Sequence, residues 1–432
     1  VLEEYRIRHI PGMNEDLAAT ALWGSQTVRA LPGATVDGVF GMWFAKAPGV
    51  DRTGDAFRTA NIRGVDPNGG VLCVAGDDPD ARSTNYPTDS NGAFYDWSMP
   101  ILFPGDVQSV LDLGRHGYAL SRCSGLWVGF KMVTDVADGA GTADWSIDRI
   151  VPLLPSVDLD GVRFTPRLRV NEVGGALKEA ERDLRYGRLK LAEAYIRLNG
   201  LNPIVNDTPT PRVGLVAAGK TYLDLRKALQ RLELDDDRLQ RAGIRIKKIS
   251  ALFPISAEEW RDFAFGLDEI IVVEEKRPFL ERFVKEALYG TAGAPRIVGK
   301  LDEHGAEFLP EHGELTADLI TRRLGPRLRD TWGIETAIEE ERPARTRIPV
   351  AVNRTPYFCS GCPHNRSLVT PEGSVVGVGI GCHIMELIVP RDEYGQLNGF
   401  TQMGAEGAQW IGASPFTTTE HTFQNIGDGT FH

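Results

Sequence analysis

From about residue 11 to residue 155, the chain alternates between helical and strand-like patterns of hydrophobic and polar positions. Asp16–Val28 is rich in alanine and places its apolar residues at the spacing of a helix. Val71–Ala75 is a short, continuous apolar run that ends at Gly76-Asp77-Asp78-Pro79, which is typical of a buried parallel strand followed by a loop. Further strands are predicted at Ile101–Phe103 and Leu126–Val133.

Two linkers are predicted from changes in composition. The charged amphipathic helix Lys178–Leu198 is followed by Asn199-Gly200, a typical helix C-terminus. The proline-rich stretch Asn202–Pro211 (NPIVNDTPTP) is then predicted to be the first linker. Glu335–Ile348 is charged, contains proline and is predicted to be the second, and glycine, cysteine and aromatic residues dominate from Pro349 onward.

A second set of alternating strands and helices lies between the two linkers. Because strands that alternate with helices favour a parallel, doubly wound sheet, we expect a second α/β domain here. The predicted elements are the strand Val213–Ala217, the helix Thr221–Leu232, the strand Ile244–Ile249, the strand Ile270–Val273 and the helix Pro278–Tyr289.

Length, composition and charge restrict the class of protein. A chain of 432 residues exceeds what one core normally serves, so two or three domains are expected. The net charge of -11 lacks the lysine and arginine clusters that nucleic acid requires, which argues against that partner. No apolar run approaches the ~20 residues of a membrane span and no signal peptide opens the chain, so we expect a cytoplasmic protein without membrane contact. Since the chain begins at Val1 and ends within a motif at His432, we expect it to be the middle section of a longer protein.

Three of the five cysteines are close together in sequence, and their spacing indicates a metal centre. Cys359 and Cys362 are separated by two residues, and Cys382 follows a glycine-rich segment. Thiolates are the preferred ligands of iron–sulfur clusters and of zinc. A fourth ligand would be a histidine such as His364 or His383, or a cysteine outside the chain. The alternative is that the thiols are simply buried apolar groups.

The tripeptide Gly427-Asp428-Gly429 follows the strand-like run Phe423–Ile426. Glycines let a backbone approach phosphate groups, and an aspartate carboxylate is a hard oxygen ligand for Mg²⁺. This pattern therefore suggests a diphosphate–metal site, although Gly-Asp-Gly alone is usually a turn.

Taken in order, these motifs resemble the indolepyruvate ferredoxin oxidoreductases, in the long fused form found in bacteria. Four segments between Tyr357 and His432 resemble the diphosphate-binding domain of that family, namely FCSGCPHN, GVGIGCH, TQMGAEGAQWIGASPF and NIGDGTFH. Three earlier segments resemble the family's pyrimidine-binding domain, namely Pro11–Gln26, Gly38–Arg52 and Gly76–Thr84. Two later segments, Ala251–Pro254 and Val272–Lys276, together resemble a transketolase C-terminal-like domain.

The resemblance implies an α/β fold with three-layer parallel-sheet domains of the thiamine-diphosphate-binding, transketolase-like type. It predicts a pyrimidine-binding domain at residues 1–155, a helical connector and linker at 156–211, a transketolase C-terminal-like domain at 212–335 and a diphosphate-binding domain at 345–432. The first and last domains are expected to be incomplete, so the chain as it stands is not expected to turn over.

The resemblance also implies oxidative decarboxylation of a 2-oxoacid such as indolepyruvate to the acyl-CoA. The implied cofactors are thiamine diphosphate, Mg²⁺ and a 4Fe–4S cluster, and the implied partners are the 2-oxoacid, CoA, ferredoxin and further copies of the chain. The implied acceptor is ferredoxin, which takes one electron at a time from the iron–sulfur centre.

Individual residues acquire roles by matching the family's motifs. Glu15, in Asn14-Glu15, matches the glutamate that hydrogen-bonds the aminopyrimidine ring, whereas without the resemblance it is an acid at a helix N-terminus. Asp428 would ligate Mg²⁺, and Gly427 and Gly429 would give backbone access to the diphosphate. Glu406 is expected near the cofactor, the alternative being an ordinary loop acid.

Cys359, Cys362 and Cys382 match three of the family's cluster ligands, and the fourth would follow His432. Cys73 and Cys123 are predicted to be packing residues. Lys46 and Arg52 occur in a loop similar to the family's substrate-facing loop, where a cation could pair with the 2-oxoacid carboxylate or simply form a surface ion pair.

A different enzyme class and a non-enzymatic class remain alternatives. The first is a thiamine-diphosphate decarboxylase or carboligase without electron transfer, in which zinc takes the three cysteines and His364 or His383. The second is a binding module that retains the fold but is catalytically silent. Loss of Glu15 or Asp428 would have favoured the binding module, and both are present.

Overall fold

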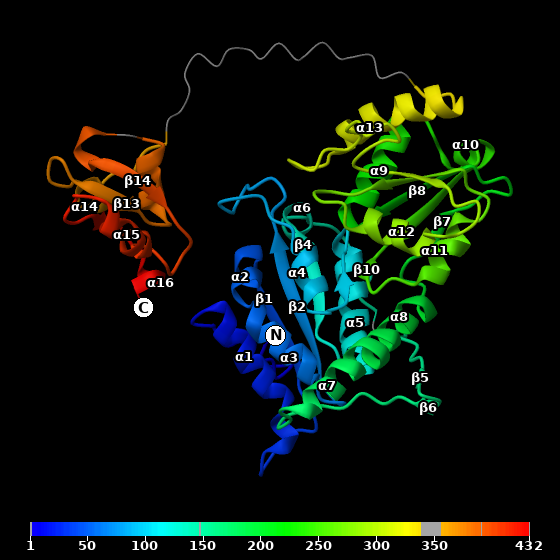
Figure 1. Ribbon diagram of the computed structural model, residues 1–432, viewed down its shortest axis with the longest axis horizontal. Helices are drawn as coiled ribbons and strands as arrows, with labels where there is room; N and C mark the ends of the chain where they lie inside the picture. Colours follow the sequence, from blue (N-terminus) through cyan, green and yellow to red (C-terminus); the bar gives the residue numbers. More distant parts are fainter. Residues whose placement is uncertain (1, 147, 338–355, 390, 432) are drawn as a thin grey trace. The chain divides into compact units, whose positions relative to one another are not determined.

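The computed structural model describes residues 2–146, 148–337, 356–389 and 391–431. The chain divides into two compact units, Val1–Glu340 and Glu341–His432, and each is described by itself (Figure 1). The segment predicted as the second linker lies outside the described residues from residue 338 onward. None of the helices in the described ranges combines the length and hydrophobicity needed to cross a lipid bilayer.

The first unit contains two five-stranded sheets, and the first of these has the order β1-β2-β4-β3-β10. The first four strands are parallel, with Phe40 opposite Gly70 and Lys46 opposite Gly76, and β10 runs antiparallel to β3. The strand β10 comes from the segment that was expected to belong to the next domain, so the two sheets are connected by this exchange. The strands are β1 (Phe40–Lys46), β2 (Gly70–Asp77), β3 (Ile101–Leu102), β4 (Val128–Val133) and β10 (Ala251–Phe253).

Helices cover both faces of this sheet, which explains why β2 is apolar at nearly every position. Side chains alternate between faces along a strand, so Val71 and Cys73 pack in one core while Leu72 packs in the other. The helix α5 begins at Asp106, which forms a capping box with Ser109. The helices are α1 (Glu15–Gln26), α2 (Ala47–Arg52), α3 (Gly54–Arg63), α4 (Asn91–Asp96), α5 (Val107–Ser124) and α6 (Thr134–Ala137), with a 3₁₀ turn at Val28–Ala30.

The predicted helix Lys178–Leu198 lies within one continuous helical segment, the middle of which is a π-helix. Arg188, at the end of this stretch, is fully buried and donates hydrogen bonds to the carbonyl oxygens of Asn61 (2.9 Å) and Ile62 (2.6 Å), so it fastens the connector to α3. The segment consists of α7 (Gly175–Arg182), the π-helix Asp183–Arg188 and α8 (Leu189–Leu198), and a small hairpin of β5 (Asp158–Leu159) and β6 (Val162–Arg163) precedes it.

The second sheet has the order β12-β11-β8-β9-β7 and is parallel except for β7. The strand β7 lies within Asn202–Pro211, which was predicted to be a linker. It forms an antiparallel edge strand, and Asn206 Nδ2 donates to the carbonyl oxygen of Ile244 (2.7 Å). The strands are β7 (Ile204–Asn206), β8 (Val213–Ala218), β9 (Ile244–Ile249), β11 (Glu269–Val273) and β12 (Arg296–Val298).

Helices on the two faces of the second sheet contribute to different cores. Leu225 on α9 and Ile320 on α13 pack in one core, and Trp260 on α11 and Val284 on α12 pack in a core that continues into the first sheet. The helices are α9 (Gly219–Arg231), α10 (Asp236–Arg241), α11 (Ala257–Ala264), α12 (Leu280–Leu288) and α13 (Ala317–Pro326), followed by a π-helix at Arg327–Thr331.

The second unit is built on a three-stranded parallel sheet of order β14-β13-β15. Phe358, Leu368 and Tyr394 form its small buried core. Its elements are α14 (His364–Ser367), β13 (Val375–Val378), 3₁₀ turns at Cys382–Leu387, Asp392–Tyr394 and Ser414–Phe416, β14 (Gln396–Phe400), α15 (Ala408–Ala413), β15 (Phe423–Gln424) and α16 (Asp428–Phe431). The α/β class predicted from the sequence is confirmed, and all three principal sheets are built mainly of parallel strands.

Candidate functional site

Glu15 is the first residue of α1 and lies against the start of α2. Asn14 caps the helix by accepting a hydrogen bond from the backbone N–H of Leu17 (2.9 Å), and Trp43 Nε1 donates to the carbonyl oxygen of Glu15 (3.0 Å). A methyl group at Gly49 would lie only 2.6 Å from Glu15 Cγ. The Glu15 carboxylate is half-buried and, within the described residues, has no hydrogen-bond or ion-pair partner. Its backbone is therefore held in place while its carboxylate can accept a hydrogen bond from a ligand.

Lys46 is the last residue of β1, and Arg52 lies at the end of α2, the helix whose Gly49 lies against Glu15. Lys46 Nζ donates to the carbonyl oxygen of Ser83 (2.7 Å), and Arg52 forms an exposed ion pair with Asp16 (3.3 Å). Both cations thus have protein partners, and Arg52 has the surface ion pair that the sequence left as an alternative. Burial raises the pKa of the neighbouring Asp51, against the opposing effect of the Arg277 guanidinium.

The loop after β2 is organised by Asp78, which sequence reasoning did not select. The Asp78 carboxylate accepts hydrogen bonds from the backbone N–H groups of Arg82 (3.0 Å), Ser83 (2.6 Å) and Thr84 (2.9 Å), and from the Thr134 hydroxyl (3.2 Å). Burial acts to raise the pKa of Asp78, but these hydrogen bonds outweigh it, and the pKa is lowered. The loop that holds Ser83 against Lys46 is therefore fixed by one ionised side chain.

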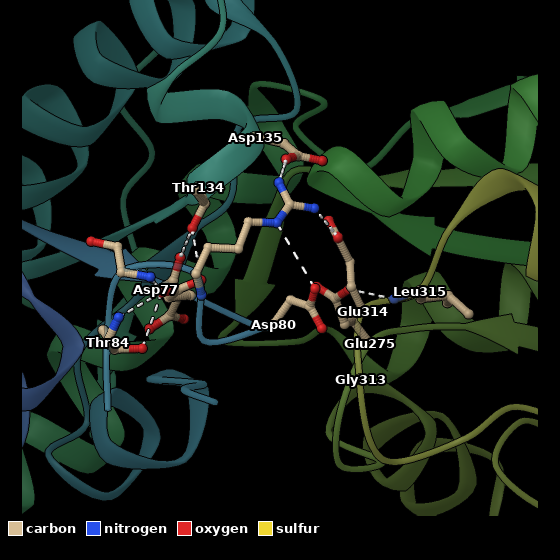
Figure 2. A network of polar contacts seen from close by, with 12 residues as sticks. Asp77, Asp80, Thr84, Thr134, Asp135, Glu275, Gly313, Glu314 and Leu315 are labelled. Atoms are coloured by element: carbon tan, nitrogen blue, oxygen red, sulfur yellow. Dashed lines mark hydrogen bonds and ion pairs between the residues drawn. The ribbon is translucent and has the colours of Figure 1, made fainter. Parts of the chain in front are cut away.

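A charged network joins this loop to the second sheet (Figure 2). The Arg82 guanidinium pairs with Asp135 (2.7 Å) after β4 and with Glu314, which precedes α13. Lys220, at the start of α9, pairs with Glu314 (2.8 Å). Burial acts to lower the pKa of Lys220, but the surrounding carboxylates outweigh it, and the pKa is raised. The carboxyl ends of β4 and β8 are thus connected through ion pairs.

In the second unit, two glycine-containing loops lie against each other at the carboxyl ends of β13 and β15. A methyl group at Gly379 would lie 2.2 Å from the carbonyl oxygen of Asn425, so only glycine fits there. Glu406 connects a third loop, because its carboxylate accepts from the Gly404 N–H (2.7 Å) and from the Thr430 hydroxyl (2.9 Å). Glu406 therefore lies beside the predicted diphosphate turn.

The side chain of Asp428 lies outside the described part of the structure. Their backbone opens the short helix α16, directly after Gly427. The predicted magnesium ligand is therefore placed by its backbone alone.

Of the three clustered cysteines, Cys362 contacts one candidate histidine ligand, and that histidine contacts the second. Cys362 Sγ lies 3.1 Å from His364 Nδ1, and His364 Nε2 lies 3.4 Å from His383 Nδ1, whereas Cys359 and Cys382 are exposed. Within the described residues, no three His, Cys, Asp or Glu side chains are grouped so as to hold a metal ion. The described arrangement does not by itself provide the three thiolates of an iron–sulfur cluster. Elsewhere in the chain, Cys73 is fully buried in one core of the first unit, and Cys123 on α5 packs against the other.

Glu386 is a second residue that sequence reasoning did not select. It is completely buried, and its Oε1 accepts a hydrogen bond from Asn425 Nδ2 (2.8 Å), two residues before Gly427. Its Oε2 and the buried hydroxyl of Tyr394 have no hydrogen-bond partner within the described residues. Burial raises the pKa of Glu386 to about 7. No local pattern marks Glu386, whereas Gly76-Asp77-Asp78-Pro79 after a strand could have indicated Asp78.

The middle of the chain matches the model of a known protein family. The model of the indolepyruvate oxidoreductase domain matches residues 204–346, which include all of the second sheet. Residues 204–346 are therefore similar to an indolepyruvate oxidoreductase domain.

Curated proteins are similar to this chain over most of its length. Indolepyruvate oxidoreductase subunit IorA of Methanothermobacter thermautotrophicus is 26% identical over 92% of this chain and 61% of its own length. IorA of Pyrococcus horikoshii is 24% identical over 82% of this chain and 52% of its own length. The chain therefore spans between half and two thirds of the length of these relatives.

A solved structure shares the fold. The 2-oxoglutarate:ferredoxin oxidoreductase from Magnetococcus marinus, with 2-oxoglutarate, coenzyme A and succinyl-CoA bound, superposes with a TM-score of 0.51 at 14% identity. The match covers 75% of this chain and 58% of that chain. At this identity, the likeness describes the fold alone.

Proposed function

We propose that the protein carrying this chain is a thiamine-diphosphate-dependent oxidoreductase that oxidises a 2-oxoacid such as indolepyruvate and passes the electrons to ferredoxin. The observation that carries the proposal is the similarity to IorA subunits over 92% of the chain, together with the match of the family domain at residues 204–346. The half-buried carboxylate of Glu15, which has no partner within the described residues, fits the chemistry of such an enzyme.

Glu15 is the proposed partner of the aminopyrimidine ring. When bound, thiamine diphosphate supplies the carbon nucleophile that such enzymes use on the 2-oxo group. Glu15 would accept a hydrogen bond from a ring nitrogen and so promote the proton transfer that creates this nucleophile. The hydrogen bond from Trp43 fixes the backbone at Glu15, and the missing side chain at Gly49 leaves room for its carboxylate.

The diphosphate side of the cofactor is assigned to the second unit. Gly427 and Gly429 would give backbone access to the phosphates, and Asp428 would hold Mg²⁺. Glu406, which accepts a hydrogen bond from Thr430, would fix the loop that carries them. Lys46 is the better placed of the two candidate substrate cations, because its partner is an uncharged carbonyl oxygen whereas Arg52 is already paired with the Asp16 carboxylate.

The iron–sulfur cluster stays a prediction on Cys359, Cys362 and Cys382. A second candidate function is favoured by the contact between Cys362 and His364, because mixed thiol and imidazole ligands are typical of zinc. In that case the protein would be a non-redox thiamine-diphosphate decarboxylase or carboligase.

Visible absorbance of the anaerobically purified protein distinguishes the two candidates. We expect a brown protein whose absorbance near 400 nm bleaches on reduction and is lost with Cys362→Ala, since thiolate–iron clusters absorb in the visible and zinc does not. Cys123→Ala is the matched control, because Cys123 packs on α5 and should leave the colour unchanged. A colourless protein that contains stoichiometric zinc would establish the second candidate instead.

The remaining partners follow from the proposed reaction. CoA would receive the acyl group and ferredoxin the electrons, and a homo-oligomer in the cytoplasm is expected. The panel of 2-oxoacids that identifies the substrate should contain aryl and branched-chain members, because no residue described here selects the side chain.

The role of Glu15 is tested in the protein that carries this chain, reconstituted anaerobically with cofactors and assayed with 2-oxoacids, CoA and ferredoxin. We expect Glu15→Gln to lower kcat by about 100-fold or more, since proton transfer by a positioned group contributes that much. Asp16→Asn is the matched control, because it is the next residue on α1 and its carboxylate faces Arg52. Full activity of Glu15→Gln would remove the proposed role.

A further inference from the structure

An arginine-lined cavity lies at the amino edge of the second sheet. Arg212 directly precedes β8, and Arg241 ends α10 just before β9. The cavity has a volume of about 380 Å³, within the range of small-molecule sites. A second compartment of similar volume adjoins it and shares Arg238 and Glu335 as lining residues.

This cavity is separate from the charged network at the carboxyl end of β8. The strand β8 begins next to Arg212 and ends at Ala218, two residues before Lys220 of the charged network. Six residues of strand span about 20 Å. The two locations therefore lie at opposite ends of the same strand.

The arginines of the cavity are unequally engaged. Arg238 is fixed, because its guanidinium donates to the carbonyl oxygens of Glu233 (2.6 Å) and Glu335 (3.4 Å). By contrast, the guanidinium groups of Arg212 and Arg241 have no hydrogen-bond acceptor or ion-pair partner within the described residues. Arg212 instead lies over the ring of Trp332, 5.2 Å from the ring centroid.

The chemistry of the lining favours an anion. Three arginines line the first compartment against one carboxylate, that of Glu335. Guanidinium groups bind phosphate through paired, charge-assisted hydrogen bonds. Thr336 lines the second compartment, and its buried hydroxyl has no partner within the described residues. The half-buried ring of Trp332 packs against the core and lies under Arg212, and the part of it that lines the cavity adds an apolar contact beside these polar groups.

We propose that this cavity binds a nucleoside diphosphate, with the phosphates on Arg212 and Arg241 and the base against Trp332. Neither Glu15 nor Lys46 nor the charged network of the first unit lines the cavity, so its ligand acts as an effector or a structural ligand. The proposal is independent of the function proposed above.

The test is calorimetric titration of the full chain with ADP, and separately with inorganic pyrophosphate, in the presence of EDTA. EDTA removes Mg²⁺, which the predicted diphosphate turn at Gly427 would need. We expect saturable binding of ADP that weakens by at least about tenfold in Arg212→Gln/Arg241→Gln, since each lost charge-assisted contact is worth that much. Pyrophosphate should bind more weakly than ADP, because it has no ring to place on Trp332.

A charge-matched control is available in Arg261→Gln/Arg322→Gln. These two exposed arginines lie on α11 and α13 and line neither compartment. The control should bind ADP as the unaltered protein does, and thermal unfolding should show that both double variants are folded. The absence of saturable ADP binding, or equal ADP affinity in Arg212→Gln/Arg241→Gln, would overturn the site. Equal affinity for ADP and pyrophosphate would overturn the assignment of a nucleoside.

Discussion

At the scale of single residues, the same side chain has different properties in different surroundings. Glu15 is half-buried, has a fixed backbone and has a carboxylate without a protein partner among the described residues. Glu386 is completely buried and uses one carboxylate oxygen to hold Asn425, next to the Gly-Asp-Gly turn. The first is therefore suited to meet a ligand, and the second to position a loop.

The pH dependence of stability tests the environment of Glu386. Burial raises its pKa from an ordinary value of 4.5 to about 7, so the folded state binds this proton more tightly than the unfolded state does. Glu386 should therefore lower stability progressively as the pH rises from 4.5 to about 7. Glu386→Gln keeps an oxygen that can accept from Asn425 and has no proton to lose.

We expect the melting temperature of Glu386→Gln, relative to the unaltered protein, to rise by a few degrees between pH 5 and pH 8. Thermal unfolding followed by circular dichroism at several pH values measures this difference. Exposed Glu420→Gln provides the comparison in the same unit. A difference that does not change with pH would show that Glu386 titrates normally.

At the scale of elements, the loop after β2 shows how one carboxylate replaces regular structure. The residues that follow Asp77 form neither strand nor helix, and three of their backbone N–H groups donate to Asp78. Because unpaired N–H groups are costly when removed from water, the loop conformation depends on this acceptor. The loop in turn presents the Ser83 carbonyl oxygen to Lys46.

We expect Asp78→Ala to lower the free energy of unfolding by about 3 kcal/mol, because several hydrogen bonds to a charged acceptor are lost together. Since the folded-state pKa of Asp78 is lowered, the stabilisation is present above the ordinary value near 3.8 and is lost as the pH falls below it. Urea denaturation at pH 7 measures the change. Asp80→Ala, in the same loop but with only a 3.9 Å contact to Arg82, should cost less than about 1 kcal/mol. Equal effects of the two substitutions would contradict the assigned role.

At the scale of the whole molecule, the two sheets of the first unit are joined by packing and by charge. One core contains Trp43 from the first sheet and Val272 from the second, and β10 contributes a strand from the later segment to the first sheet. On the polar side, Glu314 pairs with Arg82 from the loop of the first sheet (Figure 2). It also pairs with Lys220 from α9. We therefore expect the first unit to unfold in one cooperative transition.

Glu314→Ala tests this connection. It removes the shared carboxylate and leaves the nearly buried ammonium of Lys220 with fewer partners, which should cost about 3 kcal/mol. Calorimetric unfolding should also become broader, because the two sheets are less strongly coupled. The control is Glu307→Ala, whose half-exposed ion pair with Arg323 is worth less than about 1 kcal/mol. Unchanged stability of Glu314→Ala would show that apolar packing alone joins the sheets.

Much of the fold follows from hydrophobic periodicity, because long apolar runs have few alternatives to burial. The predicted strand Ile244–Ile249 is observed with the same limits, and Val71–Ala75 lies within β2. The prediction of a linker at Asn202–Pro211 was wrong, since this stretch contains β7. Three residues directly after a proline carry too weak a pattern to reveal an edge strand, which forms only because β9 provides the partner.

The sequence by itself determined the α/β class, most of the parallel strands and the motifs that resemble a thiamine-diphosphate enzyme, because these depend on local patterns and on residue spacing. Only the tertiary structure decided which side chains meet. Asp78 and Thr134, Glu314 and Arg82, Glu386 and Asn425, and the arginines of the cavity are far apart in the chain or carry no local signal. Their chemistry arises from burial and proximity, which the chain acquires only when its strands and helices pack.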